Sequence, residues 1–460
     1  MTLIKSISGI RGTIGGKPGE CLSPVDIIKY AGAYGTWIRN RQNKERISIV
    51  IGRDGRTTGK MVSDLVSITL KEIGLNVVDL GLSSTPTVEV AVTGLKADGG
   101  IIITASHNPA NWNALKLLNE KGEFLSGTDG NEILKIAEEE DFTFAEHTKS
   151  GRIIKDDSWT EKHVDLVLDL DLVDCQAIKK ASLTVAADCI NSVGGMVLPL
   201  LFERLGVKRS ILINAEPDGI FAHNPEPLPE NLKQISATVK TEKADVGFVV
   251  DPDVDRLAMI CEDGSMFGEE YTLVAVADYI LQNRKGDTVS NMSSSWALRD
   301  VTEKHGGSWF SSAVGEVNVV EEMKKRKAVI GGEGNGGIIY PEIHYGRDAL
   351  VGIALFLTHL AKCKMKCSDL RKTYPEYVIA KKKLTLDPGK NADKILEAVK
   401  ENFRKFKIDQ RDGLKIEYEK GWVQIRKSNT EPVIRIYAES NTSDAAEKLA
   451  DDVMDFVKKL

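Results

Sequence analysis

The sequence contains no apolar run of the roughly 18 residues that a membrane-spanning helix needs. Its first six residues lead straight into Gly9-Ile10-Arg11-Gly12, without the roughly 7 to 15 apolar residues of a secretory signal. It also lacks an excess of basic residues, since the net charge is -6 and both signs are interspersed. A basic face that attracts nucleic acid or an anionic membrane is therefore not expected. We predict a soluble, cytoplasmic protein that binds neither.

Cysteines are few and scattered. Only Cys363 and Cys367 lie close together, and no histidine near them completes a spacing typical of zinc sites. We expect reduced thiols, most of them packed in cores. The six are Cys21, Cys175, Cys189, Cys261, Cys363 and Cys367.

The 460 residues, 42% of them hydrophobic, are enough for several domains of roughly 150 residues each. Three consecutive segments alternate strand and helix patterns, and each closes with a buried strand that leads into a polar loop. A last segment combines a helix at 392–406, strands at 415–418, 423–426 and 433–437, and a C-terminal helix whose apolar face includes Leu460. The charged stretch 149–157 is interpreted as a linker.

These patterns predict an α/β fold with three similar mixed α/β domains of the βαβαβ type and a C-terminal α+β domain. The predicted boundaries are 1–150, 151–255, 256–370 and 371–460. Because each unit places its most polar loop at the same topological position, we expect the loops to surround one central active-site cleft.

The first of these loops follows the apolar run 99–103 and contains Ser106-His107-Asn108-Pro109. The run is typical of a buried parallel strand, and ligands usually bind at the carboxyl ends of such strands. Ser106 is therefore a candidate nucleophile beside a basic neighbour. The alternative is an ordinary strand-to-helix turn, since these residue types bond local backbone well.

The second loop places Asp251, Asp253 and Asp255 at alternate positions directly after a strand pattern. Three carboxylates so close repel one another unless a hard cation is bound, which favours Mg²⁺. Two alternatives stay open: Asp251 as the nucleophile of a phosphatase, and an acidic turn without a metal. A calcium-binding EF-hand loop is disfavoured, because Arg256 replaces its sixth-position glycine and 257–260 resembles a strand.

The third loop, Gly332-Glu333-Gly334-Asn335-Gly336-Gly337, formally matches GxGxxG. A dinucleotide fingerprint must open a helix, but an extended pattern at 338–341 follows here. We interpret the glycines as allowing close approach to a small ligand, with Glu333 accepting hydrogen bonds from sugar hydroxyls. The segment 55–61 is one residue short of a phosphate-binding P-loop and predicts no nucleotide site.

The fourth loop, 421–432, links two predicted strands of the last domain. The guanidinium of Arg426, the hydroxyls of Ser428 and Thr430, and backbone N–H groups could together hold a phosphate dianion. A plain hairpin turn is the alternative.

Taken in order along the chain, these loops resemble those of the α-D-phosphohexomutase superfamily, which includes phosphoglucomutase, phosphomannomutase and phosphoglucosamine mutase. The resemblance covers essentially the whole length. It is carried by Gly9-Ile10-Arg11-Gly12, Thr104-Ala105-Ser106-His107-Asn108-Pro109, the segment 251–256, Gly332-Glu333 and Arg426-Lys427-Ser428-Asn429-Thr430-Glu431-Pro432.

The resemblance implies that Ser106 carries a phosphoryl group and that it holds one Mg²⁺ per chain together with the three aspartates. It further implies that Lys116, Arg11 and His107 are basic groups near the phosphoserine. The residues expected to bind substrate are Arg256, Glu333, Asn335, Arg426, Ser428, Asn429 and Thr430.

The implied activity interconverts hexose 6-phosphate and hexose 1-phosphate through an enzyme phosphoserine and a bisphosphorylated sugar, with a glucose or glucosamine 1,6-bisphosphate as activator. The form of the third loop favours glucosamine phosphate, with glucose or mannose phosphate as the alternative. Pro252, Ala114, Asn335 and Gly337 depart from the pattern common in the superfamily. A sugar-phosphate phosphatase and a non-catalytic sugar-phosphate binder are the remaining alternatives, and we expect a monomer or homodimer.

Overall fold

The computed structural model describes residues 2–6, 9–42, 44–386, 391–427 and 433–460. The chain divides into two compact units, each of which is described by itself. The first unit comprises Met1–Thr272 and Asn335–Leu370, and the second comprises Leu273–Gly334 and Arg371–Leu460.

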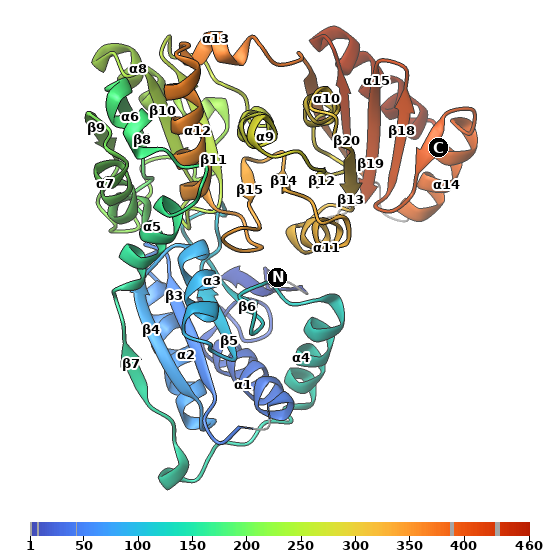
Figure 1. Cartoon of the computed structure of the whole chain (residues 1–460). Coiled ribbons are helices and arrows are strands. Elements are labelled where there is room, and N and C mark those ends of the chain that lie inside the picture. The colour runs from blue at the N-terminus through green and yellow to red at the C-terminus, as the bar shows by residue number, and fades with distance from the viewer. Residues whose placement is uncertain (1, 7–8, 43, 387–390, 428–432) are drawn as a thin grey trace. The chain divides into compact units, whose positions relative to one another are not determined.

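The first unit begins with a seven-stranded sheet in the order β1-β2-β6-β5-β3-β4-β7, of which β3 to β7 are labelled in Figure 1. Strands β5, β3, β4 and β7 run parallel, whereas the pairs β5–β6, β6–β2 and β2–β1 are antiparallel. The strands are β1 (Ile4–Ser6), β2 (Gly9–Thr13), β3 (Ser48–Arg53), β4 (Asn76–Leu82), β5 (Gly99–Ile103), β6 (Trp112–Leu118) and β7 (Ile153–Lys155).

Helices cover both faces of this sheet. Alternate residues of β5 explain the arrangement: Ile101 and Ile103 pack in the core beneath α1, α2 and α4, whereas Ile102 packs in the core beneath α3 and the first residue of α5. A strand buried on both faces needs a continuous apolar run, as the sequence has here. The helices are α1 (Pro24–Arg41), α2 (Gly59–Glu72), α3 (Thr85–Gly94), α4 (Gly127–Glu139) and α5 (Trp159–Leu168).

A second sheet of the first unit has the order β11-β10-β8-β9. The central strand β10 is parallel to β8 and antiparallel to β11, and all its residues are buried. Its carboxyl end leads directly into Asp251. The elements are α6 (Cys175–Ala181), β8 (Thr184–Asp188), α7 (Gly194–Leu205), β9 (Arg209–Ile213), α8 (Lys233–Glu242), β10 (Val246–Val250), β11 (Leu257–Cys261), β15 (Gly337–Ile339) and α12 (Ala349–Cys363); α13 (Cys367–Arg371) ends at the boundary.

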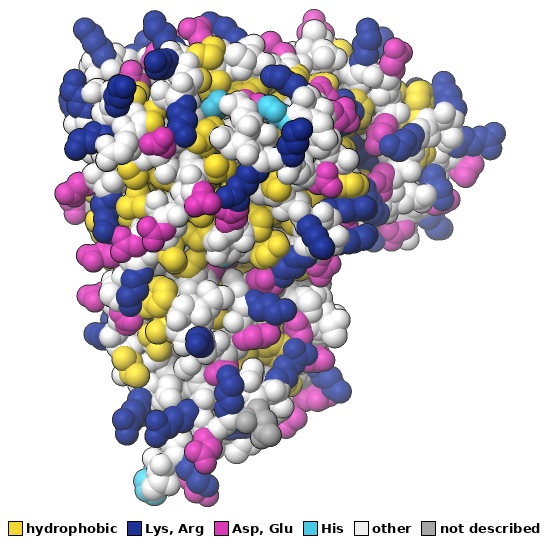
Figure 2. Space-filling view, viewed as in Figure 1, with side chains coloured by type: hydrophobic (Ala, Val, Ile, Leu, Met, Phe, Trp, Pro, Cys, Tyr) yellow, Lys and Arg dark blue, Asp and Glu magenta, His cyan; other side chains and the backbone are white. Residues whose placement is uncertain are grey.

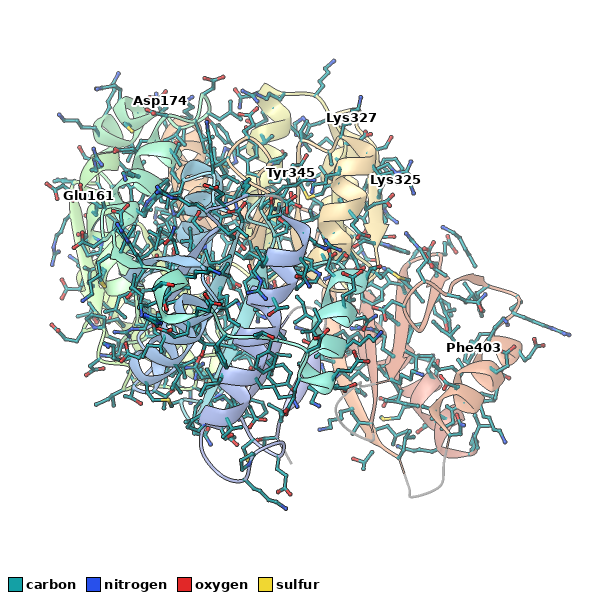
Figure 3. The ribbon with its side chains drawn as sticks, turned by 90° about the horizontal axis from the view of Figure 1, so that it is seen from below. Glu161, Asp174, Lys325, Lys327, Tyr345 and Phe403 are labelled. Atoms are coloured by element: carbon teal, nitrogen blue, oxygen red, sulfur yellow. The ribbon has the colours of Figure 1, made fainter. Side chains whose placement is uncertain are left out.

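The second unit contains parallel strands in the order β13-β12-β14 and a five-stranded antiparallel sheet in the order β16-β20-β19-β18-β17. The last helix, α15, packs Ala446, Ala450, Val453 and Val457 into the core of that sheet, and Phe403, labelled in Figure 3, contacts Phe456 edge-on. The elements are α9 (Tyr271–Asn283, which begins at the boundary), β12 (Thr288–Asn291), α10 (Ala297–Lys304), β13 (Trp309–Ser312), α11 (Glu316–Arg326), β14 (Ile330–Glu333), β16 (Val378–Thr385), α14 (Ala392–Asn402), β17 (Lys407–Asp409), β18 (Leu414–Tyr418), β19 (Gly421–Lys427), β20 (Val433–Ser440) and α15 (Ser443–Lys458).

The predicted class, three α/β domains followed by a C-terminal α+β domain, is confirmed. One local prediction was wrong: Leu460 is 48% exposed, because α15 ends before it. The stretch 149–157, interpreted as a linker, contains the exposed strand β7, which pairs with β4. Within the described residues, no helix combines the length and apolarity needed to span a bilayer. On the face drawn in Figure 2, acidic and basic side chains are interspersed.

Candidate active site

Ser106 lies just beyond the carboxyl end of β5 and is 6% exposed. Its φ of 47° is in the left-handed region, which few non-glycine residues adopt. The Ser106 hydroxyl donates a hydrogen bond to Asp251 Oδ2 (2.6 Å) and lies 3.4 Å from His107 Nδ1. Because the hydroxyl reaches a carboxylate 145 residues away rather than the local backbone, the site is more than a strand-to-helix turn.

Asp251, Asp253 and Asp255 are fully buried, and one carboxylate oxygen of each lies within 4.8 Å of the others. The backbone N–H of Val254 donates to the Asp251 carbonyl (3.0 Å), and Val254 has a φ of 59°. A left-handed β-branched residue costs about 1 to 3 kcal/mol. This strained turn brings the three carboxylates together, and β11 begins two residues after Asp255, where an EF-hand loop would continue.

The donor set fits a hard divalent cation. Within the described part of the chain, Asp253 Oδ1 and Asp255 Oδ1 are buried and accept no hydrogen bond. The Ser106 hydroxyl adds a fourth oxygen beside Asp251 Oδ2. Oxygen donors alone, three of them anionic, are the ligands that Mg²⁺ prefers. The predicted metal-binding residues therefore lie together.

Cationic groups surround the serine. Lys116 Nζ, from β6, lies 2.6 Å from Asp253 Oδ2 and 3.4 Å from Asp255 Oδ2. The backbone N–H of Arg256 donates to Asp251 Oδ1 (3.1 Å). A cavity of about 70 Å³ is lined by the side chains or backbone of Gly9, Arg11, Thr104, Ala105, Ser106, His107, Ala114, Leu115, Lys116, Arg256 and Arg347.

The crowding of charge shifts several pKa values. Burial lowers the pKa of His107 to about 2, and Arg256 adds to this effect, so the imidazole is neutral. Burial also raises the pKa of Asp251, as do the two neighbouring aspartates. For Lys116, burial lowers the pKa, but the attraction of two carboxylates outweighs it and the net shift is upward. The cavity therefore presents cations that suit a phosphoryl group, and the carboxylate cluster bonded to Ser106 suits a metal.

Glu333, in the second unit, ends strand β14 and is 5% exposed. Its Oε1 accepts hydrogen bonds from Asn291 Nδ2 (2.9 Å) and from the backbone N–H of Gly315 (3.2 Å). These donors fix the orientation of the carboxylate. Asn335 belongs to the first unit, where its Oδ1 accepts from the backbone N–H of Gly337 (3.2 Å) within its own turn.

Arg426, on β19, donates through Nε to Asp412 Oδ1 (2.9 Å). Asp412 Oδ2 in turn accepts from the backbone N–H of Val314 (2.9 Å). Three further residues predicted to bind phosphate, Ser428, Asn429 and Thr430, lie outside the described residues.

No sequence motif points to Arg347 and Thr85, whose side chains bond two of the aspartates. Arg347 Nη2 donates to Asp255 Oδ2 (2.6 Å), and Thr85 Oγ1 donates to Asp253 Oδ2 (2.6 Å). Asp412 and Asn291 were missed in the same way. Weak local signals lie near two of these four residues: Arg347 precedes the N-cap Asp348 of α12, and Asn291 is the last residue of β12.

Family models cover nearly the whole chain in four consecutive pieces. They are the phosphoglucomutase/phosphomannomutase alpha/beta/alpha domains I (residues 3–144), II (161–264) and III (268–377) and the C-terminal domain (380–456). The chain belongs to the phosphoglucomutase/phosphomannomutase family. The predicted resemblance and the predicted class of enzyme, a phosphohexomutase, are confirmed.

Among family members, a phosphoglucomutase/phosphomannomutase of Thermococcus kodakarensis is 36% identical over 441 residues, covering 95% of each chain. A "probable phosphoglucosamine mutase" of Pyrococcus abyssi is 33% identical, covering 98% of this chain and 97% of the relative.

Two solved structures have a similar fold. The crystal structure of a phosphoglucomutase/phosphomannomutase family protein from Burkholderia thailandensis superposes with a TM-score of 0.85 at 25% identity, over 99% of this chain and 97% of that one. An N-acetylphosphoglucosamine mutase of Aspergillus fumigatus, crystallised with GlcNAc-6P and magnesium, has a TM-score of 0.57 at 15% identity, over 99% and 95%.

Proposed function

We propose that the chain interconverts hexose 6-phosphates and hexose 1-phosphates, with Ser106 as the residue that carries the phosphoryl group. The observation that carries this proposal is the hydrogen bond of 2.6 Å from Ser106 Oγ to Asp251 Oδ2, inside a cluster of three buried carboxylates. A serine hydroxyl that bonds a carboxylate cluster and shares a cavity with lysine and arginine side chains suits phosphoryl transfer.

The reaction needs two transfers. The phosphoryl group leaves Ser106 Oγ for the free hydroxyl of the hexose monophosphate, and the proton of that hydroxyl ends on Ser106 Oγ. After the bisphosphate turns around, its other phosphoryl group transfers to Ser106 Oγ, and the serine proton ends on the sugar oxygen that this group leaves. Lys116 and Arg11 offset the negative charge of the transferring group, and His107, being neutral, is available as a hydrogen-bond partner of Ser106.

The metal is proposed to be Mg²⁺, one ion per chain, held by Asp251, Asp253 and Asp255 together with an oxygen on Ser106. When bound, the ion neutralises charge on the phosphoryl group. Support comes from the oxygen-only donor set and from the fungal relative crystallised with magnesium. A glucose or glucosamine 1,6-bisphosphate is proposed as the activator that phosphorylates Ser106.

We assign the remaining substrate contacts to Arg256, Glu333, Asn335 and Arg426. Arg256 lines the cavity beside Ser106, and a cavity of about 70 Å³ is small against the roughly 300 to 1,000 Å³ of typical ligand pockets. Further residues must therefore bind the rest of the sugar phosphate. We assign Glu333 and Asn335 to the sugar hydroxyls. We assign Arg426, with Ser428, Asn429 and Thr430, to the phosphate that is not reacting.

A cytoplasmic location and a monomer or homodimer stay predictions from the sequence.

Glucosamine phosphate is the proposed substrate, because a relative at 33% identity is named as a probable phosphoglucosamine mutase. Glucose or mannose phosphate is a second candidate, because a relative at 36% identity is named phosphoglucomutase/phosphomannomutase. A coupled assay that compares the 6-phosphates of glucosamine, glucose and mannose decides between them.

Ser106→Ala tests the role of the serine. We expect isomerisation to fall to background while the thermal unfolding midpoint stays near that of the wild type. Ser67→Ala is a matched control, since among the described residues the hydroxyl of this buried serine bonds Ser63 O alone, within α2. Release of inorganic phosphate without isomerisation would favour a phosphatase. Stabilisation by sugar phosphate without any turnover would favour a binding protein.

A further inference from the structure

A buried arginine outside the proposed catalytic set holds the backbone of the serine loop. Arg56 is 1% exposed and belongs to the turn after β3, Asp54-Gly55-Arg56, which we call the junction turn. The Arg56 guanidinium donates to Asp54 Oδ2 (3.1 Å). It also donates to three carbonyl oxygens of the serine loop, which we define as residues 104–111: Ser106 O (2.6 Å), Asn108 O (2.6 Å) and Pro109 O (2.7 Å). A fourth acceptor is Trp112 O (3.0 Å), at the start of β6.

Asp54 is also bonded to the serine loop, through the hydroxyl of Thr104. Asp54 Oδ2 accepts a hydrogen bond from Thr104 Oγ1 (2.6 Å), and Thr104 Oγ1 accepts one from the backbone N–H of Ser106 (2.9 Å). The carbonyl of Ser106 is therefore bound directly by Arg56, and its N–H is linked to Asp54 through Thr104 Oγ1. These bonds hold Ser106 at its left-handed φ of 47°, which aims its hydroxyl at Asp251.

The junction turn also reaches the aspartate loop. The backbone N–H of Gly55 donates to Ser192 Oγ (2.9 Å), and Ser192 Oγ donates to the carbonyl of Pro252 (2.6 Å), between Asp251 and Asp253. A Cβ on residue 55 would lie 3.0 Å from Ser192 Cα and Ser192 Oγ, so glycine permits this close approach. One short turn is thus bonded to the loop that carries the serine and to the loop that carries the carboxylates.

We propose that the junction turn, with Thr104 and Ser192, positions Ser106 Oγ against the carboxylate cluster. These are positioning residues, and their assignment rests on the proposed function of Ser106. Only arginine suits the central place, because its planar guanidinium offers five donors in a fixed fork, whereas lysine offers three on a flexible stem. Burial of the whole network protects its geometry from competition by water.

Two hydroxyl deletions that preserve side-chain shape separate positioning from folding. Thr104→Val removes the oxygen that joins Asp54 to the Ser106 N–H, and Ser192→Ala removes the oxygen that joins Gly55 to the Pro252 carbonyl. Matched controls are Thr69→Val, whose hydroxyl bonds the Leu65 carbonyl within α2, and Ser67→Ala.

In the full-length chain, we expect each deletion to lower kcat by about 10- to 100-fold and to leave KM within about twofold, as for other groups that orient reacting atoms. Both controls should match the wild type, and Thr104→Ser should recover most of the lost kcat. Phosphorylation of Ser106 by glucose 1,6-bisphosphate, followed by intact-mass measurement, should slow by the same factor. A kcat within about twofold of the wild type in both deletions would overturn the proposal.

A second measurement needs no turnover. Titration of each protein with MgCl₂, followed by the shift of the thermal unfolding midpoint, should show about tenfold weaker binding in the two deletions and no change in the controls. Unchanged Mg²⁺ affinity in both deletions would also overturn the proposal. A wild type that lacks mutase activity but shows the expected Mg²⁺ effects would contradict the proposed function and leave the positioning role supported.

Discussion

His344 is expected to stay protonated to strongly alkaline pH, and its charge should stabilise the first unit. Its Nδ1 lies 3.2 Å from Glu89 Oε2, and its Nε2 lies 3.2 Å from Asp348 Oδ2. A neutral imidazole has only one N–H and cannot donate to both carboxylates. Burial lowers the pKa of His344, but the hydrogen bond to Asp348 and the negative charge of the Glu89 carboxylate outweigh this effect and raise the pKa to about 10. His163 Nε2, at 2.9 Å, shares the same Asp348 oxygen.

The sign of the pH dependence follows from linkage. Because the pKa in the folded state lies above the ordinary value of 6.5, the stabilisation is complete below about pH 6.5 and is lost as the pH rises through about 10. A tenfold change in proton affinity corresponds to about 1.4 kcal/mol, so the protonated His344 contributes a few kcal/mol to the free energy of unfolding and at most roughly 5 kcal/mol.

The assay is urea unfolding of the wild type and His344→Gln at a series of pH values. At pH 6 the variant should lose about 2 to 4 kcal/mol, because two buried carboxylates lose their shared cation. This difference should shrink by more than half between pH 6.5 and 10. His147→Gln, at an exposed histidine, is the matched control and should change neither value. A difference for His344→Gln that does not vary with pH would refute the reasoning.

Three further predictions concern other parts of the two units. Lys116→Met should lower kcat at least about 100-fold in the coupled assay, because the transferring phosphoryl group loses a cation. It should also lower the free energy of unfolding by about 3 to 5 kcal/mol in a urea titration without Mg²⁺, because two buried aspartates lose their cation. Gly9→Ala should lower the unfolding midpoint by several degrees in a thermal melt, because the new Cβ would lie 2.3 Å from Leu115 O at a φ of 139°. Asp412→Asn should raise KM about tenfold with a smaller effect on kcat in steady-state kinetics, because Arg426 loses its charged partner.

The local elements that the sequence predicted are those with strong periodic signals. The apolar runs that became β5 and β10 are buried on both faces, and each delivers the loop expected at its carboxyl end. Ser106 and the three aspartates could be chosen because residue type and position after a strand point to the same chemistry. The four domain boundaries drawn from the sequence stay a prediction.

What the sequence did not predict depends on contacts between distant segments. Strand β6, which carries Lys116, is recognised only from its antiparallel pairing with β5 and β2. Arg347 contacts a carboxylate 92 residues away, and Arg56 binds carbonyls about 50 residues away. No local pattern encodes such pairs. In the sequence, the turn around Arg56 resembles only an incomplete P-loop, because its role depends on which loop folds against it.

The most direct test of the account follows the phosphoryl group itself. The chain is incubated with glucose 1,6-bisphosphate and Mg²⁺, and the modified peptide is located by mass spectrometry before and after a hexose 6-phosphate is added. The account predicts one phosphoryl group on Ser106 that disappears as hexose 1-phosphate forms. Isomerisation with the phosphoryl group on another residue, Asp251 included, or with none on the chain, would contradict it.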